Sequence, residues 1–102
     1  MIFKRRRYKD VIERQLDLFA SDDGDLLDDV GSALGRYNAA DRDDAEELYG
    51  DYQLAIEAAT DRLAELRDAF AGTLDDPDDY IVEFNRAVVG RWSELALTIE
   101  ES

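Results

Sequence analysis

The fold is decided by residues 45–70, which read AEELYGDYQLAIEAATDRLAELRDAF. Apolar residues recur in this stretch at alternating spacings of three and four, which is the pattern of one buried face of an α-helix. The pattern runs through the whole stretch without a break, so we expect a long helix that packs against other helices. The members of this stripe are Ala45, Tyr49, Tyr52, Ile56, Ala59, Leu63, Leu66 and Phe70.

The residues on either side of this stretch indicate where the helix begins and ends. Asp41 is a favoured N-cap residue, and acidic side chains follow it in the first turns, where the positive end of the helix dipole favours them. Gly72 and Pro77 mark the other end, because helices commonly stop before such residues. The sequence therefore predicts a helix over residues 42–73, with turns near residues 38–41 and 73–77.

A second apolar stripe lies between Ile12 and Tyr37 and has the same spacing, interrupted by one polar member, Asp23. The register does not slip across residues 21–24, so we predict one helix over residues 8–37, weakened by about 1 kcal/mol at Gly24. The alternative is a break near Gly24, which would give four helices in all. The apolar members are Ile12, Leu16, Phe19, Leu26, Val30, Ala33 and Tyr37.

The last part of the chain predicts a third helix over residues 77–99. Pro77 suits the first helical position, because its φ angle is already helical and its missing N–H would find no partner there; Asp76 is the expected cap. The predicted fold is therefore all-α: an elongated antiparallel hairpin of residues 8–37 and 42–73, completed by the third helix as a three-helix bundle. The third stripe contains Ile81, Phe84, Val88, Trp92, Leu95 and Ile99.

The composition excludes several classes of function. The chain has 102 residues, of which 26 are acidic and 12 basic, and it contains no His and no Cys. Disulfides, thiolate nucleophiles, catalytic histidines and the usual His or Cys ligands of zinc are therefore excluded. Its apolar runs are much shorter than the ~20 residues of a transmembrane helix. We expect a soluble cytoplasmic protein that is not an enzyme and uses no cofactor or metal.

The net charge of -14 is divided unevenly along the chain. Residues 1–9 form a basic leader with five bases and no acid, whereas residues 10–102 carry seven bases against all 26 acids, a net charge of -19. We expect a flexible leader and a single helical-bundle domain that does not bind nucleic acid, because phosphate contacts require clustered bases. The leader's bases, which are candidates for weak contact with anionic membrane or RNA, are Lys4, Arg5, Arg6, Arg7 and Lys9.

The apolar stripes are wider than the seam of a two-stranded coiled coil, so they require a third neighbour along their length. The predicted third helix is shorter than the hairpin and leaves the hairpin tip incompletely covered. We therefore predict an interaction or scaffolding module that binds a protein partner or forms a homodimer. Four aromatic residues on or near the stripes are candidate interface anchors. They are Tyr37, Tyr49, Tyr52 and Trp92.

Pairs of carboxylates leave one further alternative. Asp44 and Glu47 stand three residues apart, as do Glu65 and Asp68, and carboxylates are the ligands that Mg²⁺ prefers. Both pairs fall on one predicted helix, roughly 31 Å apart, so a magnesium-dependent nucleotide hydrolase would need two copies of the chain to bring them together. The acidic stretch at residues 75–79 is interpreted as a helix start.

Leu63 lies in the middle of the longest stripe, so its replacement tests the predicted register. Leu63→Ala should lower the free energy of unfolding by about 2–5 kcal/mol, because it removes buried methyl groups and leaves a cavity. Urea unfolding followed by circular dichroism measures the change. A loss near zero would show that this stripe does not face the core.

Overall fold

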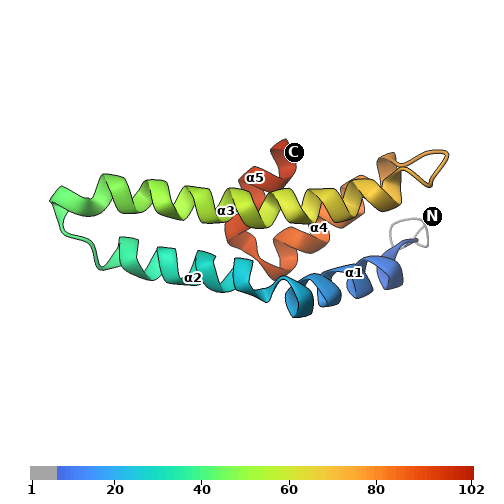
Figure 1. The fold of residues 1–102 in the computed structure, drawn as a ribbon. Helices are drawn as coiled ribbons and strands as arrows, with labels where there is room; N and C mark the ends of the chain where they lie inside the picture. The colour runs from blue at the N-terminus through green and yellow to red at the C-terminus, as the bar shows by residue number, and fades with distance from the viewer. Residues whose placement is uncertain (1–6) are drawn as a thin grey trace.

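The computed structural model describes residues 7–102, which are all-helical as predicted and contain no strand. These described residues form five α-helices and a short 3-10 helix where three helices are predicted, because the chain breaks at Asp23 and at Trp92 (Figure 1). None of the helices described here is long and apolar enough to cross a bilayer. The elements are α1 (Lys9–Asp22), α2 (Gly24–Asn38), α3 (Arg42–Ala71), α4 (Asp78–Arg91), η2 (Ser93–Leu95) and α5 (Ala96–Glu101).

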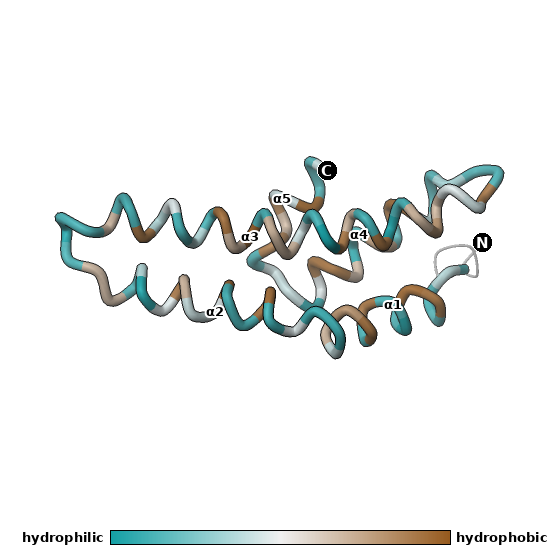
Figure 2. Tube along the Cα trace, viewed as in Figure 1, coloured by the Kyte–Doolittle hydropathy of each residue, from teal (hydrophilic) through white to brown (hydrophobic). Residues whose placement is uncertain are grey.

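The molecule is elongated, with extents of 52 × 24 × 21 Å, and its two halves are built differently. In one half, α2 and the first part of α3 lie side by side and form a two-helix arm, which we define as residues 24–58 (Figure 1). In the other half, α4 packs against both α1 and α3, and α5 packs against α3 and α4. Figure 2 shows hydrophilic residues at the tip of the arm and apolar residues along α1 and α4. Most of the buried side chains therefore lie beside the arm, although Val30, Ala33 and Ile56 are buried within it.

The core centres on Tyr80 of α4, which is completely buried. The centroid of its ring lies 5.3 Å from that of Tyr8 and 4.8 Å from that of Phe70 on α3. Its hydroxyl donates a hydrogen bond of 2.7 Å to Gln15 of α1. Burial raises the pKa of Tyr80 above its ordinary value, although the hydrogen bond to Gln15 acts in the opposite direction. One side chain of α4 thus connects α1 with α3.

The prediction of one helix over residues 8–37 is wrong: the chain breaks near Gly24, as in the alternative, although the described residues form five α-helices and not the four that this alternative gives. α1 ends at Asp22, and Asp23 has φ -117° and ψ 26°. Asp23 still points toward α3, where it accepts a hydrogen bond of 3.2 Å from Nε of Arg62, and this explains why the register continues across the break. The break lets α1 diverge from α3, and α4 lies between them (Figure 1).

The predicted third helix over residues 77–99 is wrong in its length, because the chain turns at Trp92. This residue has φ -135° and ψ 80°, and η2 and α5 then return to pack on α3. Its ring packs edge-on against Phe19 of α1, with 5.5 Å between the centroids, which links the turn to the core. Four members of the predicted third stripe are nevertheless completely buried. They are Phe84, Val88, Leu95 and Ile99.

Both predicted turns are confirmed, but their caps differ in detail. Asp41 occupies the N-cap of α3 with an extended backbone, yet its side chain makes no capping hydrogen bond. α4 begins at Asp78, one residue later than predicted, so Pro77 takes the N-cap position. Oδ1 of Asp76 accepts a long hydrogen bond, 3.4 Å, from the backbone N–H of Asp78. The acidic residues around Pro77 therefore begin a helix, as expected.

Gly24 is the first residue of α2, and its φ angle is not positive. A Cβ atom added at Gly24 would meet no atom within 4 Å. Gly24→Ala should therefore raise the free energy of unfolding by roughly 0.5–1 kcal/mol, because alanine loses less backbone entropy on folding. Thermal unfolding of both proteins measures the difference. A loss of stability would show that the break at Asp23 depends on a glycine beside it.

Candidate functional site

Three of the four predicted interface aromatics meet in the arm, and we call them the tyrosine cluster: Tyr37, Tyr49 and Tyr52. Tyr37 comes from the end of α2, and its ring centroid lies 5.3 Å from that of Tyr49 on α3. The centroids of Tyr49 and Tyr52 are 6.4 Å apart. Gln53 donates a hydrogen bond of 2.7 Å from Nε2 to the hydroxyl of Tyr49. The turn at residues 39–41 therefore brings together residues that the sequence separates.

The fourth predicted anchor, Trp92, makes a different contact. Its ring packs on Phe19, and the guanidinium carbon of Arg91 lies 5.8 Å from the ring centroid. Arg91 also forms an ion pair of 2.7 Å with Asp17 of α1. Trp92 is half-buried, and it holds the end of α4 against α1. We therefore place it with the core and not with the tyrosine cluster.

The tyrosine cluster continues a face of α3 that is covered further along the helix. Tyr49, Ile56, Thr60, Leu63 and Arg67 follow one another at spacings of seven, four, three and four, which places them on one face. The last four of these residues are buried, and α5 and η2 pack against α3. Tyr49, by contrast, is 46% exposed. The face is therefore buried from Ile56 to Arg67 and open at Tyr49.

Tyr52 marks the boundary between the closed and the open part of this face. It is half-buried, and burial raises its pKa above the ordinary value. The negative charge of Glu94 in η2 raises the pKa of Tyr52 further, because it disfavours the tyrosinate. An exposed carboxylate therefore lies near the edge of the tyrosine cluster.

The arm carries ten acidic and two basic side chains, a net charge of -8. All ten acids are exposed, and none of them forms an ion pair within residues 7–102. Tyr49, the exposed member of the tyrosine cluster, consequently lies in a region of net negative charge. The ten acids are Asp25, Asp28, Asp29, Asp41, Asp43, Asp44, Glu46, Glu47, Asp51 and Glu57.

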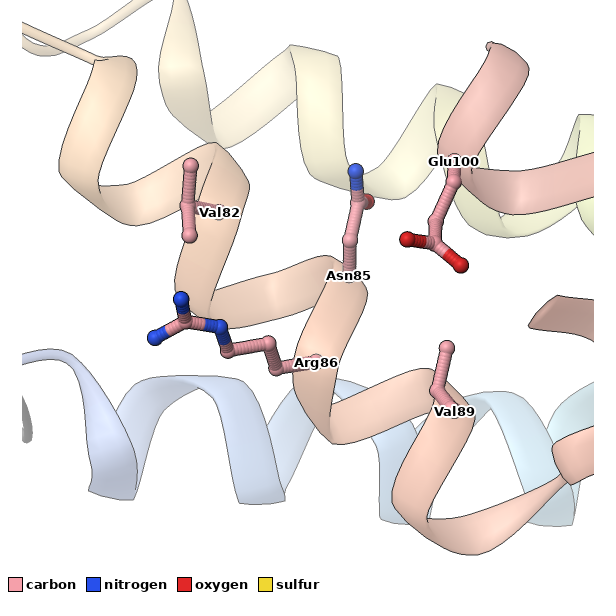
Figure 3. A pocket seen from close by; sticks show the side chains of 5 residues that line it. All are labelled: Val82, Asn85, Arg86, Val89 and Glu100. Carbon is pink, nitrogen blue, oxygen red and sulfur yellow. The ribbon is translucent and has the colours of Figure 1, made fainter. Parts of the chain in front are cut away.

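A pocket of about 380 Å³ lies on the core half and is lined by residues of α4 and α5 (Figure 3). Its lining mixes two valines with one amide and two opposite charges. In Figure 3, the carboxylate of Glu100 lies opposite Asn85, whereas Arg86 extends toward Val82. The two charged groups therefore point to different parts of the pocket. The lining residues are Val82, Asn85, Arg86, Val89 and Glu100.

Only the end of the basic leader belongs to the part of the chain that the structure describes. Lys9 is the first residue of α1 and forms an ion pair of 3.1 Å with Glu13. Arg7 lies 5.3 Å from the ring centroid of Tyr8, and both residues border a pocket of about 320 Å³ beside the acidic turn that contains Asp75. The described end of the leader therefore lies next to negative charge of the same chain. The leader bases outside the described residues are Lys4, Arg5 and Arg6.

The two carboxylate pairs lie on α3, as predicted, at Asp44 and Glu47 and at Glu65 and Asp68. Within the second pair, Glu65 accepts a hydrogen bond of 3.1 Å from Arg62, and Asp68 accepts one of 2.8 Å from a neighbouring arginine. Residues 7–102 contain no group of three or more acidic side chains placed to hold a metal ion. A hydrolase site formed by two copies of the chain stays a prediction.

Arg67 is an important residue that the sequence interpretation missed. Its side chain is only 5% exposed, and it donates hydrogen bonds to Asp68 (2.8 Å), Asn85 of α4 (3.1 Å) and the main-chain oxygen of Ser102 (3.5 Å). The guanidinium therefore ties α3 to α4 and to the end of α5. Its spacing of four from Leu63 is the signal in the sequence that places it on an inner face.

Comparison of the chain with protein-family models, curated proteins and solved structures found no match.

Arg67→Ala should lower the free energy of unfolding by about 2–4 kcal/mol, because it removes a buried side chain and leaves its hydrogen-bond acceptors unpaired. Arg86→Ala is the matched control, since Arg86 is exposed on α4 and its loss should change stability by no more than about 0.5 kcal/mol. Urea unfolding of the three proteins compares them. Equal stability of both variants would mean that the buried contacts of Arg67 do not hold the helices together.

Proposed function

We propose that this protein is a non-enzymatic protein–protein interaction module and that the arm is its recognition surface. The observation that carries the proposal is the open face of α3: Ile56 and Leu63 are buried on it, whereas Tyr49 is 46% exposed on the same face. Tyrosine is enriched among the residues that contribute most to binding, because it offers a large apolar ring and a polar hydroxyl. A cytoplasmic location stays a prediction from the sequence.

The rest of the molecule supports this division of roles. The core half closes around Tyr80, and no buried side-chain nitrogen or oxygen among the described residues lacks a hydrogen-bond partner. In the part of the chain that the structure describes, the arm consists of α2 and the first part of α3, and no third helix buries Tyr49. Proteins that recognise a partner through a helix face present that face, uncovered, on a rigid fold. The partner in this proposal is another protein or a second copy of the chain.

A capture experiment with full-length protein tests the proposal. Tagged wild-type protein, the arm variant Tyr37→Ala/Tyr49→Ala and the control variant Leu54→Ala are compared for the proteins that they retain from a source lysate. Leu54 is a suitable control because it lies on α3, is 65% exposed, and is five residues from Tyr49, which places it far round the helix. We expect the arm variant to lose the specific partners and the control to keep them.

The same experiment separates this proposal from tethering through the basic leader. The full-length variant Lys4→Gln/Arg5→Gln/Arg6→Gln removes three of the leader's charges and leaves the arm unchanged. We expect it to retain its protein partners. Partners that survive the arm substitutions but disappear with the leader substitutions would contradict the proposal and support an electrostatic tether, whose binding should also weaken steeply with added salt.

A further inference from the structure

The chain itself shows how a helix can cover the open face of α3. Leu95 and Ile99 are four residues apart in η2 and α5, and both are completely buried where these elements pack against α3 and α4. This part of the bundle therefore accepts apolar residues at helical spacing. Tyr49 lies on the same face of α3, two turns before Ile56. Neither η2 nor α5 buries Tyr49 at this position.

The neighbouring surface of α2 also permits close approach. Leu27, Gly31 and Leu34 follow one another at spacings of four and three, so they form a row on α2. A Cβ atom at Gly31 would meet nothing within 4 Å, and its φ angle is not positive. Nothing in the described fold therefore requires glycine here, although glycine destabilises a helix interior relative to alanine. A partner helix that packs against the backbone of α2 would make use of the missing side chain.

The charges beside the open face indicate which kind of helix fits. Glu46, Tyr49, Gln53 and Glu57 follow one another at spacings of three, four and four, so the two carboxylates flank the tyrosine along α3. Glu46 and Glu57 are exposed, and Glu94 of η2 lies near Tyr52. A second copy of the arm would bring another net charge of -8 to this surface, which electrostatic repulsion disfavours.

We propose that the arm binds a basic amphipathic helix of another protein. The apolar side of this helix packs on the tyrosine cluster and on Leu34, and its Lys or Arg side chains lie against Glu46, Glu57 and Glu94. Residues 42–56 of α3 offer about 22 Å, which is the length of about four helical turns. The inference rests on the function proposed above and adds the chemistry of the partner.

A synthetic helix of defined sequence tests the proposal on the full-length protein. The probe is a fluorescein-labelled peptide of about 16 residues, made of Leu and Lys with Leu at spacings of three and four, and its binding is followed by fluorescence anisotropy. A peptide of the same composition in scrambled order and an analogue with Glu in place of Lys are the controls. We expect the amphipathic basic peptide to bind at least about tenfold more tightly than either control.

Variants of the protein locate the bound helix. Tyr49→Ala should weaken binding about tenfold, whereas Val82→Ala, which truncates a similarly exposed residue of α4, should leave it unchanged. Gly31→Gln places a side chain in the path of the helix and should also weaken binding about tenfold. Gly90→Gln is its control, because Gly90 lies in α4 and likewise has open space around it. Thermal unfolding of each variant confirms that the fold is retained.

Charge variants test the second half of the proposal. Glu46→Gln/Glu57→Gln should weaken binding and reduce its dependence on salt, whereas Asp75→Asn/Asp76→Asn at the far end of the molecule should do neither.

Equal binding of the scrambled peptide, or peptide binding that is unchanged by Tyr49→Ala and Gly31→Gln, would overturn the proposal. A dimer detected by light scattering and abolished by Gly31→Gln would overturn it in favour of a second copy. If the arm variant of the capture experiment loses partners but the peptide does not bind, only this proposal fails.

Discussion

The rest of the structure depends on the change of direction at Asp23. An unbroken helix from α1 to α2 would continue along α3, and α4 would then have no space between them. Because the chain bends there, α4 can contact both neighbours: Tyr80 reaches Gln15 of α1, and Asn85 reaches Arg67 of α3. The hydrogen bond between Arg62 and Asp23 joins the bend to α3 and raises the pKa of Arg62 above its ordinary value.

This single bend also produces the difference between the two halves of the molecule. Beyond Asp23, α2 stays beside α3 and no further helix of residues 7–102 joins them, so the arm remains two helices wide (Figure 1). On the other side, α4 packs against α1 and α3, and the returning α5 packs against α3 and α4, so more of the apolar side chains there are buried. The exposed Tyr49 is compatible with a stable protein because most of the buried side chains lie in the core half.

The sequence predicts the long helix α3, both turns and most of the buried residues, because these features depend on local spacing and on residues such as Asp41 and Pro77. It offers the break near Gly24 only as an alternative, and it does not predict the turn at Trp92. In the sequence, Asp23 is only a polar interruption of a continuous apolar stripe. Its role is not visible there, because its hydrogen-bond partner Arg62 is distant in sequence. Trp92 has the spacing of an inner residue of a straight helix, and only its contact with Phe19 shows that the chain turns there.

The candidate site was partly predictable for the same reason. Spacing identifies Tyr37, Tyr49 and Tyr52 as residues of the apolar stripes, but only the fold shows that they meet and that the cover of α3 ends beside them. Trp92 has the same spacing and lies in the core. Arg67 went unnoticed because arginine is rarely buried, and its burial requires acceptors on α4 and near the end of α5.

The central position of α4 has a consequence for the order in which the chain folds. Tyr80 and Gln15 are 65 residues apart in the sequence. At a synthesis rate of about 5–20 residues per second, α4 is therefore made roughly 3–13 s after the inner face of α1 that it covers. The contacts between α2 and α3, by contrast, close through a short turn and are available earlier. On the ribosome, the arm can therefore form first, and the core that supports it is completed last.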